Sequence, residues 1–187
     1  PLITNTDLGK IKDYRREEFT HVTIPMLFPA SSGGEGLRQA LEEICQAAEK
    51  AVDQEKNYII LSDRGVSMEN AAIPSLLATA AVHHHLIKAR KRMQAGLIVE
   101  TGEAREVMHF ALLLGYGASV INPYVCFATI NEEVEKGNIE GTYSEARERY
   151  IKAVDKGLMK VLSKMGISTL RSYHGAQIFE AVGVSNE

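Results

Sequence analysis

Polar side chains follow three apolar, strand-like segments in the middle of the chain. Asp63 and Arg64 come after the first segment, Glu100 ends the second and Asn122 follows the third. Polar residues at the carboxyl ends of parallel strands are where α/β proteins bind ligands and carry out chemistry. These side chains are therefore the first candidates for a site, and a stand-alone enzyme acting on a small ligand is one function that such a site would support.

Structural roles compete with functional ones at these positions. An Asp63–Arg64 ion pair would hold the loop after its strand together, and we favour that role because no nucleophile or base stands nearby. Glu100 is followed by a Thr-Gly pair at the expected start of a helix, whose free N–H groups could bind an anion. Glu103 argues against an anion there, since it already complements the helix dipole.

A second polar group lies near the carboxyl end of the chain. Tyr173 and His174, together with Arg171 and Gln177, follow a short strand candidate. We therefore add Tyr173 and His174 to the four strand-end residues as a candidate polar or interdomain cluster.

The histidines do not form a metal-binding pattern. His83, His84 and His85 are consecutive, whereas side chains on one helix face are three or four residues apart, and the i±4 neighbours of His83 and His85 carry no ligand group. We expect one or two of them to form hydrogen bonds beneath a neighbouring loop while the third meets solvent. His109 lies in an apolar helical stretch, which is typical of a core or interface residue.

Composition excludes several classes of protein. A net charge of −3 and a sequence with no strongly basic face predict no nucleic-acid or acidic-membrane partner. Cys45 and Cys126 are too few and too far apart for an iron–sulfur cluster or a structural zinc site, and fit a reducing, cytoplasmic compartment. The longest apolar run, 71–87, is broken by Pro74 and the histidines, so neither a membrane span nor a signal peptide is predicted.

Strand and helix patterns alternate through most of the chain, which predicts an α/β fold. The glycine-rich run 33–36 has the wrong spacing for a dinucleotide fingerprint and predicts a flexible turn, and no GxSxG or Walker motif is present. Pro25 predicts an edge position for the first strand. Strands are expected over 21–28, 57–61, 96–99, 118–121 and 167–170. Helices are expected over 5–11, 37–54, 74–92, 103–114 and 175–182, with two more beginning at the capping boxes Thr129–Glu132 and Thr142–Glu145. Four or five strands are too few for a closed barrel of eight, so an incomplete (β/α) barrel-like parallel sheet flanked by helices is the predicted architecture.

Several long segments resemble the central domain of the glutamate synthase large subunit. They are Leu61–Gly65 (LSDRG), Ile73–Ile87 (IPSLLATAAVHHHLI), Glu100–Ala118 (ETGEAREVMHFALLLGYGA), Ile121–Tyr124 (INPY) and Lys152–Gly183 (KAVDKGLMKVLSKMGISTLRSYHGAQIFEAVG). The resemblance covers nearly the whole chain and is strongest after Leu61.

The resemblance implies a part of a larger enzyme. In that family an amidotransferase domain releases ammonia from glutamine, and an FMN-binding barrel with an iron–sulfur cluster uses the ammonia and 2-oxoglutarate to make glutamate. The central domain joins the two, looks like a relative of the FMN-binding TIM barrel without its flavin, and is thought to help wall an ammonia channel. The resemblance thus implies no catalytic residue, cofactor or metal in this chain, and the other two domains as its partners.

The resemblance also sets expectations for the extent of the chain. We expect a single domain over 1–187 that starts part-way through the family's central domain, with a polar leading segment over 1–20, βα units over 21–126, and a helical pair with a last βα unit over 127–187. Missing upstream elements would expose an apolar surface, so we expect the isolated chain to self-associate.

Overall fold

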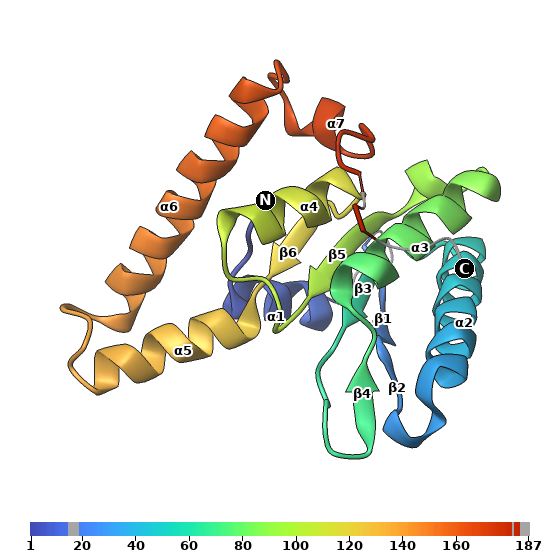
Figure 1. Ribbon diagram of the computed structural model, residues 1–187, viewed down its shortest axis with the longest axis horizontal. Coiled ribbons are helices and arrows are strands. Elements are labelled where there is room, and N and C mark those ends of the chain that lie inside the picture. The colour runs from blue at the N-terminus through green and yellow to red at the C-terminus, as the bar shows by residue number, and fades with distance from the viewer. Residues whose placement is uncertain (15–18, 181, 184–187) are drawn as a thin grey trace.

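A four-stranded parallel sheet forms the centre of the computed structural model, which describes residues 1–14, 19–180 and 182–183 (Figure 1). Its strands are β1 (His21–Pro25), β3 (Tyr58–Ser62), β5 (Gly96–Glu100) and β6 (Val120–Asn122). They lie in the order β1-β3-β5-β6, so neighbours in space follow the order of the chain and β1, with its proline, is at an edge as predicted. A sheet that winds in one direction without closing confirms the prediction of an incomplete, barrel-like α/β fold.

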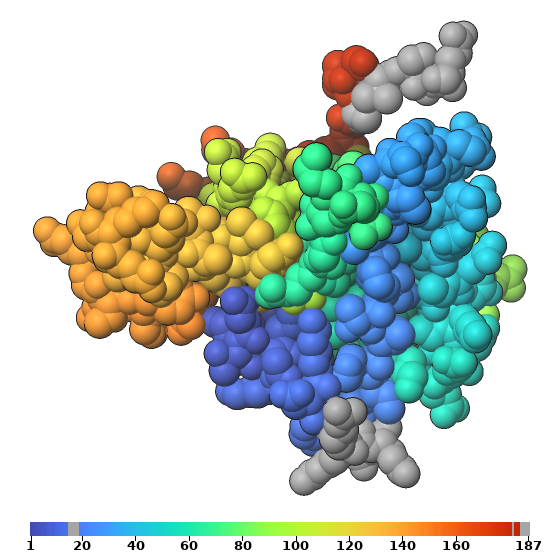
Figure 2. All heavy atoms as spheres, turned by 90° about the horizontal axis from the view of Figure 1, so that it is seen from below, coloured from blue at the N-terminus to red at the C-terminus, as the bar shows by residue number. Residues whose placement is uncertain are grey.

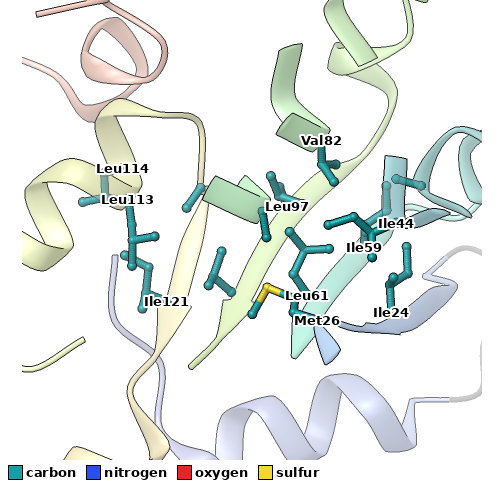
Figure 3. Packing of buried hydrophobic residues seen from close by; sticks show 14 of the residues in the cluster. Ile24, Met26, Ile44, Ile59, Leu61, Val82, Leu97, Leu113, Leu114 and Ile121 are labelled. Carbon is teal, nitrogen blue, oxygen red and sulfur yellow. The ribbon is translucent and has the colours of Figure 1, made fainter. Parts of the chain in front are cut away.

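One face of the sheet packs against three helices, α2 (Gly33–Asp53), α3 (Ser75–Lys88) and α4 (Val107–Gly115) (Figure 1). Figure 3 shows the main core there, with Ile59, Leu61 and Leu97 of the sheet facing Ile44 of α2 and Val82 of α3. Side chains alternate between the two faces of a strand. Alternate residues of β3 and β5 therefore point to the opposite face of the sheet. Because that face is covered as well, the apolar runs of both strands are buried on both sides.

The opposite face is covered by α1 (Asn5–Asp13). Leu8 of α1 is buried against Ile60 and Ile98, the side chains that alternation directs to this face. Thr4 and Asp7 cap the helix reciprocally, and a bridge between Leu2 and Ile121 extends the sheet beyond β6. The N-terminal segment therefore covers a face that a closed barrel would turn inward.

An apolar groove of about 510 Å³ is left beside α1. Its lining includes Ile11, Tyr58, Ile98 and Val120, with Tyr14 and Phe19 at its rim. Grooves of this kind favour association. Self-association of the isolated chain stays a prediction, which sedimentation over a range of concentrations would measure.

Helices α5 (Tyr124–Glu135) and α6 (Tyr143–Lys164) form an arm that projects from the sheet, seen as the orange lobe in Figure 2. The arm is joined to the body where α6 packs on α4 through Val154, Leu158 and Leu162. Gly157 makes the approach close, since a Cβ at this position would lie 2.4 Å from a methyl group of Val107. The short helix α7 (Leu170–Tyr173) then returns to the end of α4 (Figure 1).

The first predicted strand is in fact two. The chain turns at Met26, whose N–H donates to the Ser62 carbonyl, and continues as β2 (Leu27–Pro29), which pairs antiparallel with β4 (Asn70–Ala72). The short strand β4 was not predicted because only three residues form it, and its pairing partner lies more than 40 residues away in the sequence.

Several predicted boundaries are wrong. The run 33–36 is the first turn of α2 rather than a flexible turn, α3 ends at Lys88, and α4 begins at Val107 rather than at 103. Thr129 does not begin a helix: α5 starts five residues earlier, and the Thr129 hydroxyl donates to the Val125 carbonyl inside it. The expected division at 126/127 therefore falls within α5.

The predicted last βα unit is also wrong. Residues 167–169 form no strand, and Leu170 begins α7. Of the predicted helix 175–182, residue 181 lies outside the described residues and the others are not helical. The capping box at Thr142 and Glu145 is confirmed as the start of α6. Short 3₁₀ helices, η1 (Ala30–Ser32) and η2 (Arg92–Gln94), precede α2 and β5.

Candidate functional site

Glu100 lies at the centre of the strand-end cluster. It is the last residue of β5, is 2% exposed, and pairs in register with Ser62 on β3 and Asn122 on β6. Because these three residues share a row of the sheet, their side chains point to the face that α1 covers. Sheet register alone thus brings two of the predicted residues together.

Three donors bind the Glu100 carboxylate. Ser62 Oγ donates at 2.7 Å and Lys12 Nζ at 2.8 Å to Oε2, while Arg64 Nε donates to Oε1. Burial alone would raise the pKa of Glu100, but the hydrogen bonds from Lys12, Arg64 and Ser62 outweigh it and hold that pKa below its ordinary value. Glu100 is therefore a paired carboxylate anion, suited neither to donating a proton nor to accepting one near pH 7.

Asp63 binds the neighbouring loop instead of Arg64. Its carboxylate accepts hydrogen bonds from the Thr101 hydroxyl at 2.7 Å and from the Gly102 N–H at 2.8 Å. The expected Asp63–Arg64 ion pair is thus wrong, because Arg64 reaches across to Glu100. The structure also supports the argument against an anion site after Glu100, since Asp63 accepts the Gly102 N–H and α4 begins only at Val107.

Arg64 also contacts the aromatic ring of Tyr124, the first residue of α5. The Arg64 guanidinium lies 3.9 Å from the centre of the Tyr124 ring, an arrangement that favours a cation–π interaction. Burial and the neighbouring Asp63 carboxylate raise the pKa of Tyr124 to about 12. Its hydroxyl therefore stays protonated and is a poor base.

Asn122 ties the N-terminal segment to the cluster. Its amide Nδ2 donates to the Ile3 carbonyl and to Asn5 Oδ1, both at 3.0 Å. Its Oδ1 is buried and has no hydrogen-bond partner among the described residues. The residue acts as an anchor for the start of α1.

Tyr173 and His174 lie at the opposite end of the sheet. The Tyr173 hydroxyl donates to the Ala111 carbonyl of α4, and His174 lines a cavity next to Asn57 and Ser119, which precede β3 and β6. The six candidate residues therefore do not surround one pocket. Asp63, Arg64, Glu100 and Asn122 are brought together at the carboxyl ends of the strands, whereas Tyr173 and His174 are at the amino ends.

The three histidines behave largely as predicted. His83 is buried and its Nδ1 accepts a hydrogen bond from Arg92 Nε at 2.9 Å, His85 pairs with Glu49 of α2, and His84 is exposed. Burial, followed by the charge of Arg92, lowers the pKa of His83 to about 4. Of the two roles expected for His109, core and interface, the core role is wrong. The residue is exposed, and its Nδ1 accepts backbone N–H groups of Arg105 and Glu106 at the start of α4.

Lys12, Ser62, Thr101 and Tyr124 also belong to the cluster, although the sequence did not single them out. Strand alternation and register place Ser62 beside Glu100, so that residue could have been found. Lys12 could not, because its position depends on where α1 packs.

Three further properties concern the described residues only. Within 1–14, 19–180 and 182–183, no three His, Cys, Asp or Glu side chains gather to hold a metal ion. Across the same residues, no helix has the length and apolar character to cross a membrane. Cys45 and Cys126 are both free thiols.

Comparison with known proteins identifies the family. The model of the glutamate synthase central domain matches residues 1–185. The whole chain aligns with the glutamate synthase (NADPH) large chain of Bacillus subtilis at 43% identity, the ferredoxin-dependent glutamate synthase of Pyropia yezoensis at 40%, and the glutamate synthase (NADH) of Schizosaccharomyces pombe at 39%. It spans 12%, 13% and 9% of their respective lengths. The chain belongs to the glutamate synthase central-domain family.

Proposed function

We propose that this chain is the non-catalytic central module of a glutamate synthase, a single domain that connects a glutamine amidotransferase domain to an FMN-binding synthase domain in the cytoplasm. In this role it contributes to the wall of the channel through which ammonia passes. The whole enzyme makes glutamate from glutamine and 2-oxoglutarate, with FMN and an iron–sulfur cluster held by the other domain. A fixed wall raises the effective concentration of ammonia at the second site and keeps water away from it.

The observation that carries the proposal is that the carboxylates at the strand ends already bind other groups of the same fold. In barrel enzymes the carboxyl ends of the strands hold the reacting groups. Here Glu100 is bound by Ser62, Arg64 and Lys12, and Asp63 is bound by the loop after β5. An ion-paired Glu100 and a hydrogen-bonded Asp63, both already bound within the fold, favour a framework role over a catalytic one.

The comparisons support a role that is independent of the electron donor. Relatives named for NADPH, ferredoxin and NADH match this chain over its whole length at 43%, 40% and 39% identity. A module common to all three fits a position away from the donor's binding site.

The framework role is tested with Glu100→Gln in the native polypeptide that contains this chain. Glutamine keeps the size of the side chain but removes the charge that pairs with Arg64 and Lys12. We expect the rate of glutamate synthesis to fall only in proportion to the folded fraction. A fully folded variant whose kcat drops by about 100-fold or more would assign Glu100 to the chemistry and refute the proposal.

The channel role is tested with Gly157→Ala, which forces α6 away from Val107 of α4. Gly34→Ala is the matched control, because a Cβ there meets nothing within 4 Å. We expect the Gly157 variant to release free ammonia, so that less than one additional glutamate forms per glutamine hydrolysed, while the control stays coupled. Full coupling in a variant whose α6 has demonstrably moved would contradict a wall at this position.

Flavin binding separates the module from a barrel that kept its cofactor. We expect the isolated chain to retain no flavin absorbance after incubation with FMN and gel filtration, and to show no glutaminase activity. Tight stoichiometric binding of FMN would overturn the framework proposal.

A further inference from the structure

The cavity at the amino ends of the strands has the lining of an anion site. It measures about 550 Å³ and lies between η2, α7 and the residues that precede β3, β5 and β6. Its described lining holds two arginines and several amide and hydroxyl groups but no carboxylate. We propose that this cavity binds a small oxyanion, of the phosphate or carboxylate type. The proposal does not rest on the function proposed above, because the cavity lies at the end of the sheet opposite Glu100.

Arg92 is the central cation of the cavity. Its three guanidinium nitrogens donate to His83 Nδ1, the Ala95 carbonyl at 2.9 Å and the Gly117 carbonyl at 2.6 Å. These contacts fix the plane of the guanidinium, and each of its two terminal nitrogens keeps a second N–H. All three acceptors are neutral groups, so the partly buried charge of Arg92 has no counter-ion among the described residues. Partly buried cations are normally paired, so the absence of a carboxylate points to an external anion.

Neutral donors with fixed orientation line the same cavity. Asn57 Oδ1 accepts the Thr20 N–H at 2.9 Å, which leaves its NH₂ group as the free end of the amide. Ser119 Oγ accepts the Leu97 N–H at 3.2 Å, which leaves its hydroxyl hydrogen available. Because the oxygen atoms of both side chains already accept hydrogen bonds, the groups that remain for a ligand in the cavity are donors. Oxyanions are the ligands that such a lining complements.

Arg171 of α7 supplies the second positive charge. Its side chain is exposed and forms no ion pair with any described residue. Burial and the charge of Arg92 lower the pKa values of both His83 and His174, so neither histidine adds charge near neutral pH. The positive potential of the cavity therefore comes from the two arginines.

The anion has two possible sources with the same chemistry. One is a free oxyanion. The other is a carboxylate side chain from a part of the native polypeptide outside the described residues. The substitution Asn57→Asp distinguishes a cavity that holds an anion, from either source, from a cavity that holds none. It retains the oxygen bonded to Thr20 and replaces the free NH₂ group by a negatively charged oxygen.

The experiment measures phosphate binding and thermal stability in the native polypeptide that contains this chain. Inorganic phosphate is titrated by calorimetry into the parent protein, Asn57→Asp and Arg171→Gln. Lys160→Gln is the control, because this exposed lysine on α6 lies away from the cavity and its replacement removes the same charge as Arg171→Gln. We expect one saturable site that Asn57→Asp abolishes, Arg171→Gln weakens about tenfold, and the control leaves unchanged.

The remaining outcomes are also decisive. If a carboxylate of the same polypeptide fills the cavity, phosphate does not bind, and Asn57→Asp and Arg171→Gln both lower Tm relative to the control. This result supports the site with an internal occupant. If phosphate does not bind and Asn57→Asp leaves Tm unchanged or raises it, its new carboxylate meets unpaired arginines in an empty cavity. That result overturns the proposal.

Discussion

The burial of His83 predicts that mild acid, below about pH 6.5, destabilises this chain. His83 is 7% exposed and accepts a hydrogen bond from the Arg92 guanidinium, so the folded state holds the imidazole neutral. Burial, then Arg92, His84 and His174, lowers its folded pKa to about 4, against 6.5 when the side chain is free. Between these two pH values His83 binds a proton in the unfolded chain but stays neutral in the folded chain. The contribution of His83 to the free energy of unfolding is therefore fully present above about pH 6.5 and is lost as the pH drops toward 4.

The magnitude follows from the width of that window. An interval of about 2.5 pH units corresponds to about 3 kcal/mol, at about 1.36 kcal/mol per unit. Native proteins are stabilised by only about 5–15 kcal/mol in total, so the loss is a large fraction of the stability. His174, whose pKa is also lowered by burial and by Arg92, acts in the same direction.

Urea unfolding of the 187-residue chain at a series of pH values, from about 7.5 to about 4.5, measures the effect. We expect the free energy of unfolding to fall steeply below about pH 6.5, and the slope to be clearly smaller in His83→Gln, which cannot take up a proton. His84→Gln is the control, because that neighbour is exposed. Equal slopes in the parent chain and in His83→Gln, or a His83 resonance that titrates near 6.5, would refute the reasoning.

Three other substitutions test the packing and the caps by chemical denaturation. Gly117→Ala should cost about 3 kcal/mol or more, because the residue has φ +111° and its Cβ would lie 2.1 Å from His83 Nδ1, whereas Gly9→Ala meets open space and should be neutral or slightly stabilising. Glu100→Gln should cost about 2 kcal/mol, a value reduced by the partial exposure of Lys12 and Arg64, and no loss would contradict the ion cluster. Thr142→Ala should cost about 1 kcal/mol through the lost cap of α6, and an equal cost for Thr129→Ala, inside α5, would argue against capping as the cause.

Those parts of the fold that depend on local pattern were predictable from the sequence. The buried strands β3, β5 and β6 follow apolar runs that end in polar residues, and α6 follows a capping box. The hairpin of β2 and β4 was not predictable, because three-residue strands carry no periodic signal and are stabilised by pairing across the fold. Thr129 shows the converse: a capping sequence is overridden when an earlier turn, after Pro123, already starts the helix.

The candidate site was predictable in position but not in pairing. The residues at the strand ends were found because side chains that follow parallel strands gather at one edge of a sheet. Their partners were not, since Arg64 turns from its sequence neighbour Asp63 to Glu100, 36 residues away. His174 does not lie with them, because residues 167–169 form no strand and α7 places His174 at the amino ends of the strands.

The helix α1 links the incomplete barrel to the closed cluster. In a complete barrel the inward face of each strand is covered by the strands opposite, and its upper end stays open to a ligand. Here four strands leave that face uncovered, and α1 fills it, with Leu8 against Ile60 and Ile98. The same helix carries Lys12 to Glu100, so the element that completes the core also neutralises the carboxylate at the strand ends. Covering half a barrel with a helix thus stabilises the sheet and closes the position where a barrel enzyme would bind its substrate.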